Sequence, residues 1–286
     1  MEPILTEADR AFFEEQGYVL IKGVVPKENC DAVIDMLYDF LGFDRNNPED
    51  WYHAPLTRGG MCEIYQHQAL WNNRQHPRIH QAFSEIRGTE KLLVSFDRAN
   101  FNPPVHPEHP EYDHQGMIHW DIDPATAHTC TFGVQGVLYL DDTPVERGGF
   151  CCVPGHHKLI THWAATGEKV PGIPKEGGRT PADKSEIEIT PIVGEAGDLV
   201  IWDRRLLHGN GRNLSDRPRF AQYITMSLAS ASTEEQIADR VMRWEKRLSP
   251  EAFWAPGDPR RTEELYGTTA TLTPLGEKLL GKTRWE

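Results

Sequence analysis

Residues 117–123 read MIHWDID, where His119, Asp121 and Asp123 alternate with apolar residues. Side chains two residues apart on an extended strand point to the same face, so a strand here would carry one imidazole and two carboxylates on one side. Such a face either meets water or surrounds a ligand that binds through nitrogen and oxygen atoms. The stretch alone leaves both interpretations open, because histidine-x-aspartate triplets arise by chance in most chains of this size.

A second histidine favours the metal interpretation. His208 follows the apolar segment DLVIWDRRLL and precedes Gly209, where a neighbouring backbone can approach closely. Two histidines and one carboxylate on one face of an octahedron leave three positions free, which suits Fe(II). A chelating co-substrate would take two of these positions and O2 the third. Asp123 is expected to be a supporting or solvent-facing residue, because Pro124 turns the chain away after it.

Arg219 is the expected anion clamp. It follows His208 in the segment SDRPRFAQYITM, at the start of an apolar run. A guanidinium at the mouth of a buried site offers two parallel hydrogen bonds to a carboxylate. Taken alone, Arg219 would be interpreted as an ordinary strand-edge arginine beside Arg217. Together with the three candidate metal ligands, it is expected to bind the co-substrate.

Short apolar segments separated by turns fill the middle of the chain. They predict antiparallel strands, and with helices before and after them they predict a mainly β fold with flanking α-helices, built as a barrel or jelly roll. The strand-like segments are LLVSFDRANF, TFGVQGVLYLDD, FCCVPGHHK, DLVIWDRRLL and RPRFAQYITMSLA. Helices are expected over about 7–16, 27–43, 62–88 and after 232, the first capped by Thr6 with Asp9 and the last by Ser232 with Glu235.

No repeat or linker divides the chain. We therefore expect one domain over 1–286, with a helical N-terminal part over about 1–90, a jelly-roll core over about 91–230 and a helical C-terminal extension over about 231–286. Residues 163–185 are rich in glycine, proline and charge, and they are too long for an ordinary connection. They are expected to form a lid or an excursion from the core.

The composition limits the partners. The formal net charge of -13 argues against nucleic acid or an anionic membrane as a partner. No apolar run approaches the roughly 20 residues of a membrane span. The first ten residues, MEPILTEADR, do not resemble a secretory signal, and the five cysteines include no C-x-x-C pair. We expect a cytoplasmic protein with free thiols.

Five motifs together are more specific than any one of them. In their order and spacing, HWD, GVLYLDD, GGFCCVPGHH, AGDLVIWDRRLLHGNG and RPRFAQYIT resemble the phytanoyl-CoA dioxygenase family of Fe(II)/2-oxoglutarate oxygenases, over about residues 10–230. The resemblance implies a double-stranded β-helix, a jelly-roll or cupin-like barrel, with iron at one open end. It implies that 2-oxoglutarate and O2 are converted to succinate and CO2 while an organic substrate is oxidised. Under it, His119, Asp121 and His208 bind iron and Arg219 binds the distal carboxylate of 2-oxoglutarate.

Further contacts follow from the same resemblance. Asn210 matches a position that often touches 2-oxoglutarate. The segment DRANFNPP is similar to the ectoine hydroxylase branch, where an asparagine at the place of Asn100 binds the co-substrate and an arginine at the place of Arg98 faces the substrate. Gln135 is a further expected co-substrate contact, although a glutamine on a sheet face explains it equally well. The substrate is expected to meet Arg98, Trp120 and His114, the 101–116 loop and the 163–185 excursion.

The carboxylate of Asp121 bears on the type of reaction. Family members that halogenate carry a small residue at this place, so Asp121 favours hydroxylation of a small-molecule metabolite, or a related desaturation or demethylation. Two alternatives use the same barrel: a Zn(II) hydrolase or isomerase, and a non-catalytic small-molecule binding protein. Arg219 argues against the hydrolase, which needs no clamp there, and the intact ligand set argues against the binding protein.

Overall fold

The computed structural model describes residues 2–175, 178–250, 252 and 254–286. Its α-helices are α1 (Glu7–Gln16), α2 (Lys27–Leu41), α3 (Gln68–Arg74), α4 (Pro77–Arg87), α5 (His156–Thr166), α6 (Glu234–Lys246), α7 (Thr262–Tyr266) and α8 (Pro274–Leu280). Its strands are β1 (Tyr18–Ile21), β2 (Leu92–Val94), β3 (Ala99–Asn102), β4 (Ile118–His119), β5 (Val134–Tyr139), β6 (Phe150–Cys152), β7 (Thr190–Pro191), β8 (Leu199–Asp203), β9 (His208–Asn210), β10 (Arg219–Tyr223) and β11 (Met226–Leu228). Short 3-10 turns lie at Pro48–Tyr52, Pro110–Tyr112, Pro124–Thr126, Val145–Arg147, Lys184–Glu186 and Ala229–Ala231.

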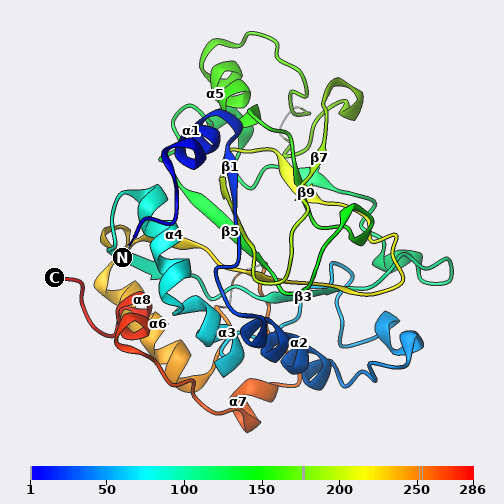
Figure 1. The fold of residues 1–286 in the computed structure, drawn as a ribbon, viewed down its shortest axis with the longest axis vertical. Helices are drawn as coiled ribbons and strands as arrows, with labels where there is room; N and C mark the ends of the chain where they lie inside the picture. Colours follow the sequence, from blue (N-terminus) through cyan, green and yellow to red (C-terminus); the bar gives the residue numbers. More distant parts are fainter. Residues whose placement is uncertain (1, 176–177, 251, 253) are drawn as a thin grey trace.

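Two antiparallel sheets form the centre of the molecule (Figure 1). The larger has the order β1-β8-β5-β10-β3 and the smaller the order β4-β9-β6-β7, while β2 and β11 pair separately. From β3 to β10 the chain passes between the two sheets, with β6 and β7 as neighbours in the smaller one. This path is that of a jelly roll, the double-stranded β-helix, and it confirms the predicted fold class. The strand pairing among the described residues leaves both sheets open at their edges.

The N-terminal helices cover the outer face of the larger sheet. Helix α1 begins at the predicted capping box, in which the Thr6 hydroxyl accepts from the Asp9 amide and the Asp9 carboxylate accepts from the Thr6 amide. The helix predicted over 62–88 is instead two helices, α3 and α4. The chain turns at His76, which is extended because Pro77 follows it, and α4 starts at that proline.

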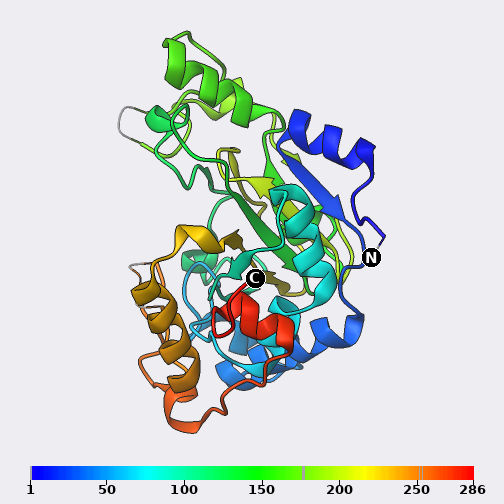
Figure 2. The same cartoon turned by 90° about the vertical axis from the view of Figure 1, so that its left-hand side faces the viewer.

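The C-terminal extension is helical, as predicted, and packs at the end of the molecule opposite α1 and α5 (Figures 1 and 2). Helix α8 contacts β2, and the Trp285 indole donates to the Leu92 carbonyl. The predicted capping box is wrong by one residue. A 3-10 turn ends at Ala231 and leaves Ser232 extended, so the cap of α6 is Thr233 with Gln236.

Buried apolar side chains form three clusters between the sheets and the helices. The largest lies between the five-stranded sheet and the helices, and it runs in sequence from Leu5 to Leu280. The second fills the space between the two sheets with side chains such as Tyr139, Phe150 and Trp202. The third lies under α5 and includes Trp120 and Ile160. All five cysteines are free, as predicted, and no helix of the described residues could cross a membrane.

Candidate metal centre

The sequence stretch MIHWDID reaches the smaller sheet only through its first half. Strand β4 is two residues long and pairs antiparallel with β9, which sets His119 opposite His208 and Ile118 opposite Gly209. A Cβ atom at Gly209 would lie 2.0 Å from the Met117 carbonyl oxygen. Only glycine lets the two strands approach this closely, and this approach brings the two histidines together.

The side chains of His119, Asp121 and His208 converge. One ligand atom from each lies within 4.8 Å of the others, and the described residues contain no other such group of histidine, cysteine or acidic residues. His119 Nε2 is 3.1 Å from Asp121 Oδ1, and His208 Nε2 is 3.6 Å from Asp121 Oδ2. Asp123 stays outside the group. Its carboxylate accepts from the Ala125 amide and caps the turn at Pro124–Thr126.

The protonation states suit a cation. Burial lowers the pKa of His208 to about 4, so its imidazole is neutral near pH 7. The Nδ1–H group of this imidazole donates to the Leu206 carbonyl at 2.9 Å, which leaves Nε2 with its lone pair directed toward Asp121. Burial raises the pKa of Asp121, but the contacts with His119 and Gln135, and His208 when it is protonated in acid, outweigh burial and hold the pKa below the ordinary carboxyl range. The neutral His208 imidazole and the Asp121 carboxylate can therefore bind a divalent ion without first losing a proton.

The group opens into a cavity of about 360 Å³. Its wall combines both sheets with the 59–61 loop and the segment that joins β2 to β3. The lining residues are Gly59, Met61, Asp97, Arg98, Asn100, His114, Met117, His119, Asp121, Gln135, Gly136, Phe150, Trp202, His208, Gly209, Asn210, Tyr223 and Thr225. Phe150 and Trp202 pack on the His208 ring, with centroids 5.9 and 5.0 Å away, and hold it in place.

Arg219 is buried without a counter-ion. Its side chain is 2 % exposed, Nε has no hydrogen-bond partner, and no ion pair to it is found among the described residues. Arg219 is not among the residues that line the cavity, but its charge contributes, after burial, to lowering the pKa of His114, which does line it. A buried guanidinium that lacks a partner is costly unless an anion completes the site. A carboxylate ligand would supply the missing partner of Arg219 Nε.

The three predicted amides all line the cavity. Asn100 donates through Nδ2 to the Gly59 carbonyl, and its Oδ1 is buried without a partner. Asn210 donates to the Tyr223 hydroxyl at 3.3 Å. Gln135 donates to Asp121 Oδ2 at 2.7 Å and so braces a ligand.

Of the predicted substrate contacts, the structure brings only Arg98 and His114 into the cavity. Trp120 follows β4 directly and is fully buried, with its ring packed against His156 at a centroid distance of 5.5 Å. Its placement among the substrate contacts is therefore wrong, and strand alternation is the reason. No described residue of the 163–185 excursion lines the cavity either. The Arg179 carbonyl instead accepts from the Trp120 amide, beside β4.

The sequence predicted no role for several residues that line the cavity. Tyr223 lies four residues after Arg219 on the same strand face, so the alternation of β10 could have revealed it. Asp97 begins the segment DRANFNPP, but no role was predicted for it. Met61 and Gly59 come from a loop whose place beside β3 depends on the bridge between Met61 and Asn100. No local sequence signal predicts such a bridge.

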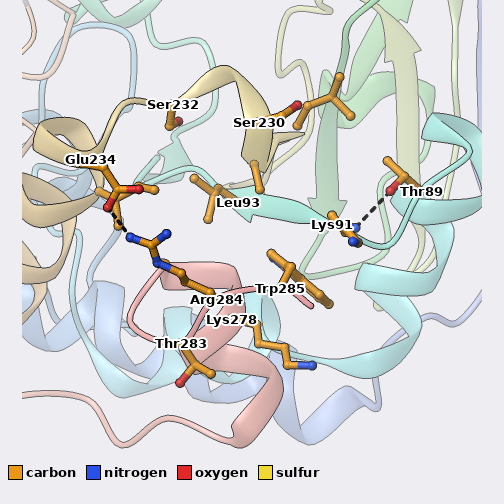
Figure 3. Close-up of a pocket in the computed structure, with 14 residues that line it drawn as sticks. Thr89, Lys91, Leu93, Ser230, Ser232, Glu234, Lys278, Thr283, Arg284 and Trp285 are labelled. Carbon is orange, nitrogen blue, oxygen red and sulfur yellow. Dashed lines mark hydrogen bonds and ion pairs between the residues drawn. The ribbon is translucent and has the colours of Figure 1, made fainter.

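A second hollow of about 400 Å³ lies between α6, α8 and the β2–β11 pair (Figure 3). Its walls are apolar at Leu93 and Trp285 and basic at Lys91, Lys278 and Arg284. Its one acidic lining residue, Glu234, is paired with Arg284. The lining contains no histidine or cysteine, so this hollow has no donor set for a transition metal.

Comparison with known proteins agrees with the site. The family model "Phytanoyl-CoA dioxygenase (PhyH)" matches residues 13–221. The chain is 25 % identical over 260 residues to the Dictyostelium discoideum protein "Putative phytanoyl-CoA dioxygenase", a match that covers 74 % of this chain and 73 % of that protein.

Two solved structures show the same fold. The epimerase SnoN, in complex with Fe3+, α-ketoglutarate and nogalamycin RO, is 20 % identical with a TM-score of 0.53, over 77 % of this chain and 82 % of its own. GIG2 from Candida albicans is 13 % identical with a TM-score of 0.72, over 100 % of this chain and 78 % of its own. The family match spans both the HWD stretch and the histidine of β9, and the donor set there is two nitrogens and one oxygen, as Fe(II) oxygenases use. The chain therefore belongs to the phytanoyl-CoA dioxygenase (PhyH) family and is an iron- and 2-oxoglutarate-dependent dioxygenase.

Proposed function

We propose that this dioxygenase hydroxylates a small-molecule metabolite in the cavity beside His119, Asp121 and His208, and releases succinate and CO2. The observations that carry the proposal are this donor group and a buried Arg219 whose Nε lacks a partner and whose charge acts on His114, a residue of the same cavity wall. A donor group alone would suit Zn(II) hydrolysis equally well. A clamp for a second carboxylate is needed only if a dicarboxylate binds beside the metal.

His119, Asp121 and His208 would hold Fe(II), and 2-oxoglutarate would bind in the cavity beside them. Bound there, iron with 2-oxoglutarate supplies the oxidising power to insert oxygen into a C–H bond. The chain's own residues position the reactants. The Leu206 carbonyl fixes the His208 tautomer, Gln135 holds one oxygen of Asp121, and Arg219 neutralises the distal carboxylate of the co-substrate.

Polar side chains in the cavity would complete co-substrate binding. The amides of Asn100 and Asn210 lie in the wall and can reorient toward a carboxylate or keto oxygen. His114 has a buried Nε2 without a partner and lies close enough to Arg219 for its pKa to be lowered by that charge, after burial. Neutral His114 can donate one hydrogen bond to a ligand from Nε2, since its Nδ1 already accepts from the Gly116 amide. Phe150 and Trp202 keep the region around the metal dry.

The test is substrate-stimulated succinate release with Fe(II), 2-oxoglutarate and O2 across a panel of metabolites. We expect His208→Ala to abolish release, while His162→Ala leaves it unchanged, because His162 is exposed on α5 and pairs only with Glu168. Zn(II) in place of Fe(II) should give an inactive protein. Hydrolysis supported by Zn(II), without any succinate under air, would contradict the proposal and favour the hydrolase.

A further inference from the structure

The segment between β2 and β3 carries an acidic residue in the cavity wall that the proposed mechanism does not use. Asp97 and Arg98 both line the cavity. Their backbone is fixed on two sides, since the Asp97 carbonyl accepts from the Arg74 guanidinium at 2.5 Å and the Arg98 carbonyl accepts from the Tyr223 amide at 3.0 Å. These two hydrogen bonds fix the backbone that carries the Asp97 side chain.

The Arg98 guanidinium, next to Asp97, forms an ion pair with another carboxylate. Arg98 NH1 donates to Glu63 Oε1 at 2.6 Å, in a pair whose two side chains are each 9 % exposed. The other Glu63 oxygen accepts from the Tyr65 hydroxyl and from the Gly257 amide. Arg98 Nε is 3.7 Å from Asp97 Oδ1, beyond hydrogen-bond distance, and has no hydrogen-bond partner. Glu63 and Asp97 both lie beside the Arg98 guanidinium, and Glu63 has the direct contact.

Asp97 keeps one oxygen open to the cavity. Its Oδ1 accepts from the Arg98 amide at 2.8 Å, and no hydrogen bond to Oδ2 is found from any residue that the structure describes. The Asp97 side chain is 27 % exposed. Burial raises the pKa of Asp97 although Arg98 and Arg74 lie near it, so the carboxylate is incompletely compensated. A partner that donates and is positively charged would remove this deficit.

We propose that the open Asp97 oxygen binds a protonated nitrogen of the substrate, so that the enzyme selects small molecules that carry an amine. This inference rests on the proposed function, since it concerns the substrate half of the same cavity. A hydroxyl group could also donate to Asp97, but a charged donor makes the stronger hydrogen bond and balances the second carboxylate. The specificity arises because an uncharged, N-acylated analogue would leave the Asp97 carboxylate without a cation.

The test uses matched pairs of amines and their N-acetyl derivatives: L-lysine with Nε-acetyl-L-lysine, 5-aminopentanoate with 5-acetamidopentanoate, and putrescine with N-acetylputrescine. Each probe is titrated calorimetrically into the full chain loaded anaerobically with Fe(II) and 2-oxoglutarate. We expect at least one amine to bind about tenfold more tightly than its acetylated partner. Asp97→Asn, which keeps an oxygen for the Arg98 amide, should remove this preference.

The control variant is Asp216→Asn, because Asp216 is exposed and outside the cavity. It should keep the wild-type preference. If Asp97→Asn does not fold, Asp97→Ser takes its place in the same comparison. The inference is overturned if no amine is preferred by the wild-type protein, or if the preference survives in the Asp97 variant. The absorption of the Fe(II)–2-oxoglutarate complex, recorded on the same samples, separates this failure from failure of the proposed function: a normal band without amine preference contradicts only the role of Asp97.

Discussion

At the scale of single residues, Arg219 distinguishes this site from other uses of a two-histidine, one-carboxylate group. Its guanidinium is buried and lacks a described partner, so the folded protein carries the cost of its desolvation until an anion binds. The exposed neighbour Arg217 carries no such cost. This contrast makes the two arginines a natural pair for mutation.

Arg219→Lys should raise the KM for 2-oxoglutarate by about tenfold or more, since lysine keeps the charge but loses the two parallel hydrogen bonds. The kcat at saturating 2-oxoglutarate should change less. Steady-state succinate formation against 2-oxoglutarate concentration measures both. Arg217→Lys is the control and should leave the KM unchanged. An equal KM in Arg219→Lys would show that this arginine does not hold the co-substrate.

Residue patterns predicted part of the site and missed the rest for a physical reason. His119, Asp121, His208 and Arg219 lie on or next to strands, so strand alternation and motif spacing could indicate them. The same alternation buries Trp120 on the opposite face, which the prediction of a substrate contact overlooked. Glu63, which fixes Arg98, lies 35 positions away from it in sequence and could be identified only from the folded chain.

At the scale of elements, the metal centre depends on a pair of very short strands. Strand β4 has two residues, and its register against β9 is the only strand pairing described for it. The sequence predicted a strand around His119 but a loop at His208, where the structure has β9. It did not predict how short β4 is, because the Pro124 turn and the capping Asp123 end it early. The helix boundaries erred for similar local reasons, at Pro77 and at Ser232.

Gly209→Ala should weaken Fe(II) binding at least about tenfold, because a Cβ atom 2.0 Å from the Met117 carbonyl forces β4 away from β9 and separates the histidines. Anaerobic titration with Fe(II) in the presence of 2-oxoglutarate measures the affinity. Gly59→Ala is the matched control, since Gly59 also lines the cavity and a Cβ atom there meets nothing within 4 Å. Unchanged affinity in Gly209→Ala would show that the close approach of the strands is dispensable.

Helix α7 contributes a buried carboxylate to the loop before α3. Glu263 accepts from the backbone amides of Tyr65 and Gln66, and burial raises its pKa to about 7 from the ordinary 4.5. The folded state therefore binds more protons than the unfolded state between about pH 4.5 and 7, and the stability contributed by this group falls as the pH rises through that window.

Glu263→Gln should flatten this pH dependence, which amounts to at most about 3 kcal/mol. Urea unfolding at pH 5 and pH 8 measures it in both proteins. Glu264→Gln is the control, because Glu264 pairs with Arg261 at the surface and should leave the slope unchanged. If the free energy of unfolding of Glu263→Gln still falls between pH 5 and pH 8 as in the wild-type protein, other groups cause the pH dependence.

At the scale of the whole molecule, the sequence predicted the jelly roll and its helical flanks, since hydrophobic periodicity and turn residues are local signals. It could not predict that the C-terminal extension reaches the cavity wall, through the Gly257 amide on Glu63 and the Trp254 ring against the Arg98 guanidinium at 5.4 Å. We propose that residues 1–286 form one domain. The support is a single apolar cluster that contains Leu5 and Leu280 together.

Leu279→Ala in α8 should then destabilise the whole chain by about 2–5 kcal/mol, because Leu279 is fully buried in that cluster. Fluorescence and circular dichroism should show one coincident unfolding transition, shifted to lower denaturant. Leu265→Ala, at an exposed leucine of α7, should unfold like the wild-type protein. Two separate transitions would show that the C-terminal extension is an independent unit.

The central claim is that His119, Asp121 and His208 bind Fe(II) beside a 2-oxoglutarate held by Arg219. Anaerobic addition of Fe(II) and 2-oxoglutarate to the purified protein tests it most directly, through the visible metal-to-ligand charge-transfer band of the chelate. We predict that the band forms in the wild-type protein and in His162→Ala, is absent in His119→Ala and His208→Ala, and needs more 2-oxoglutarate in Arg219→Lys. No band in the wild-type protein, or an unchanged band in His119→Ala, would contradict the account.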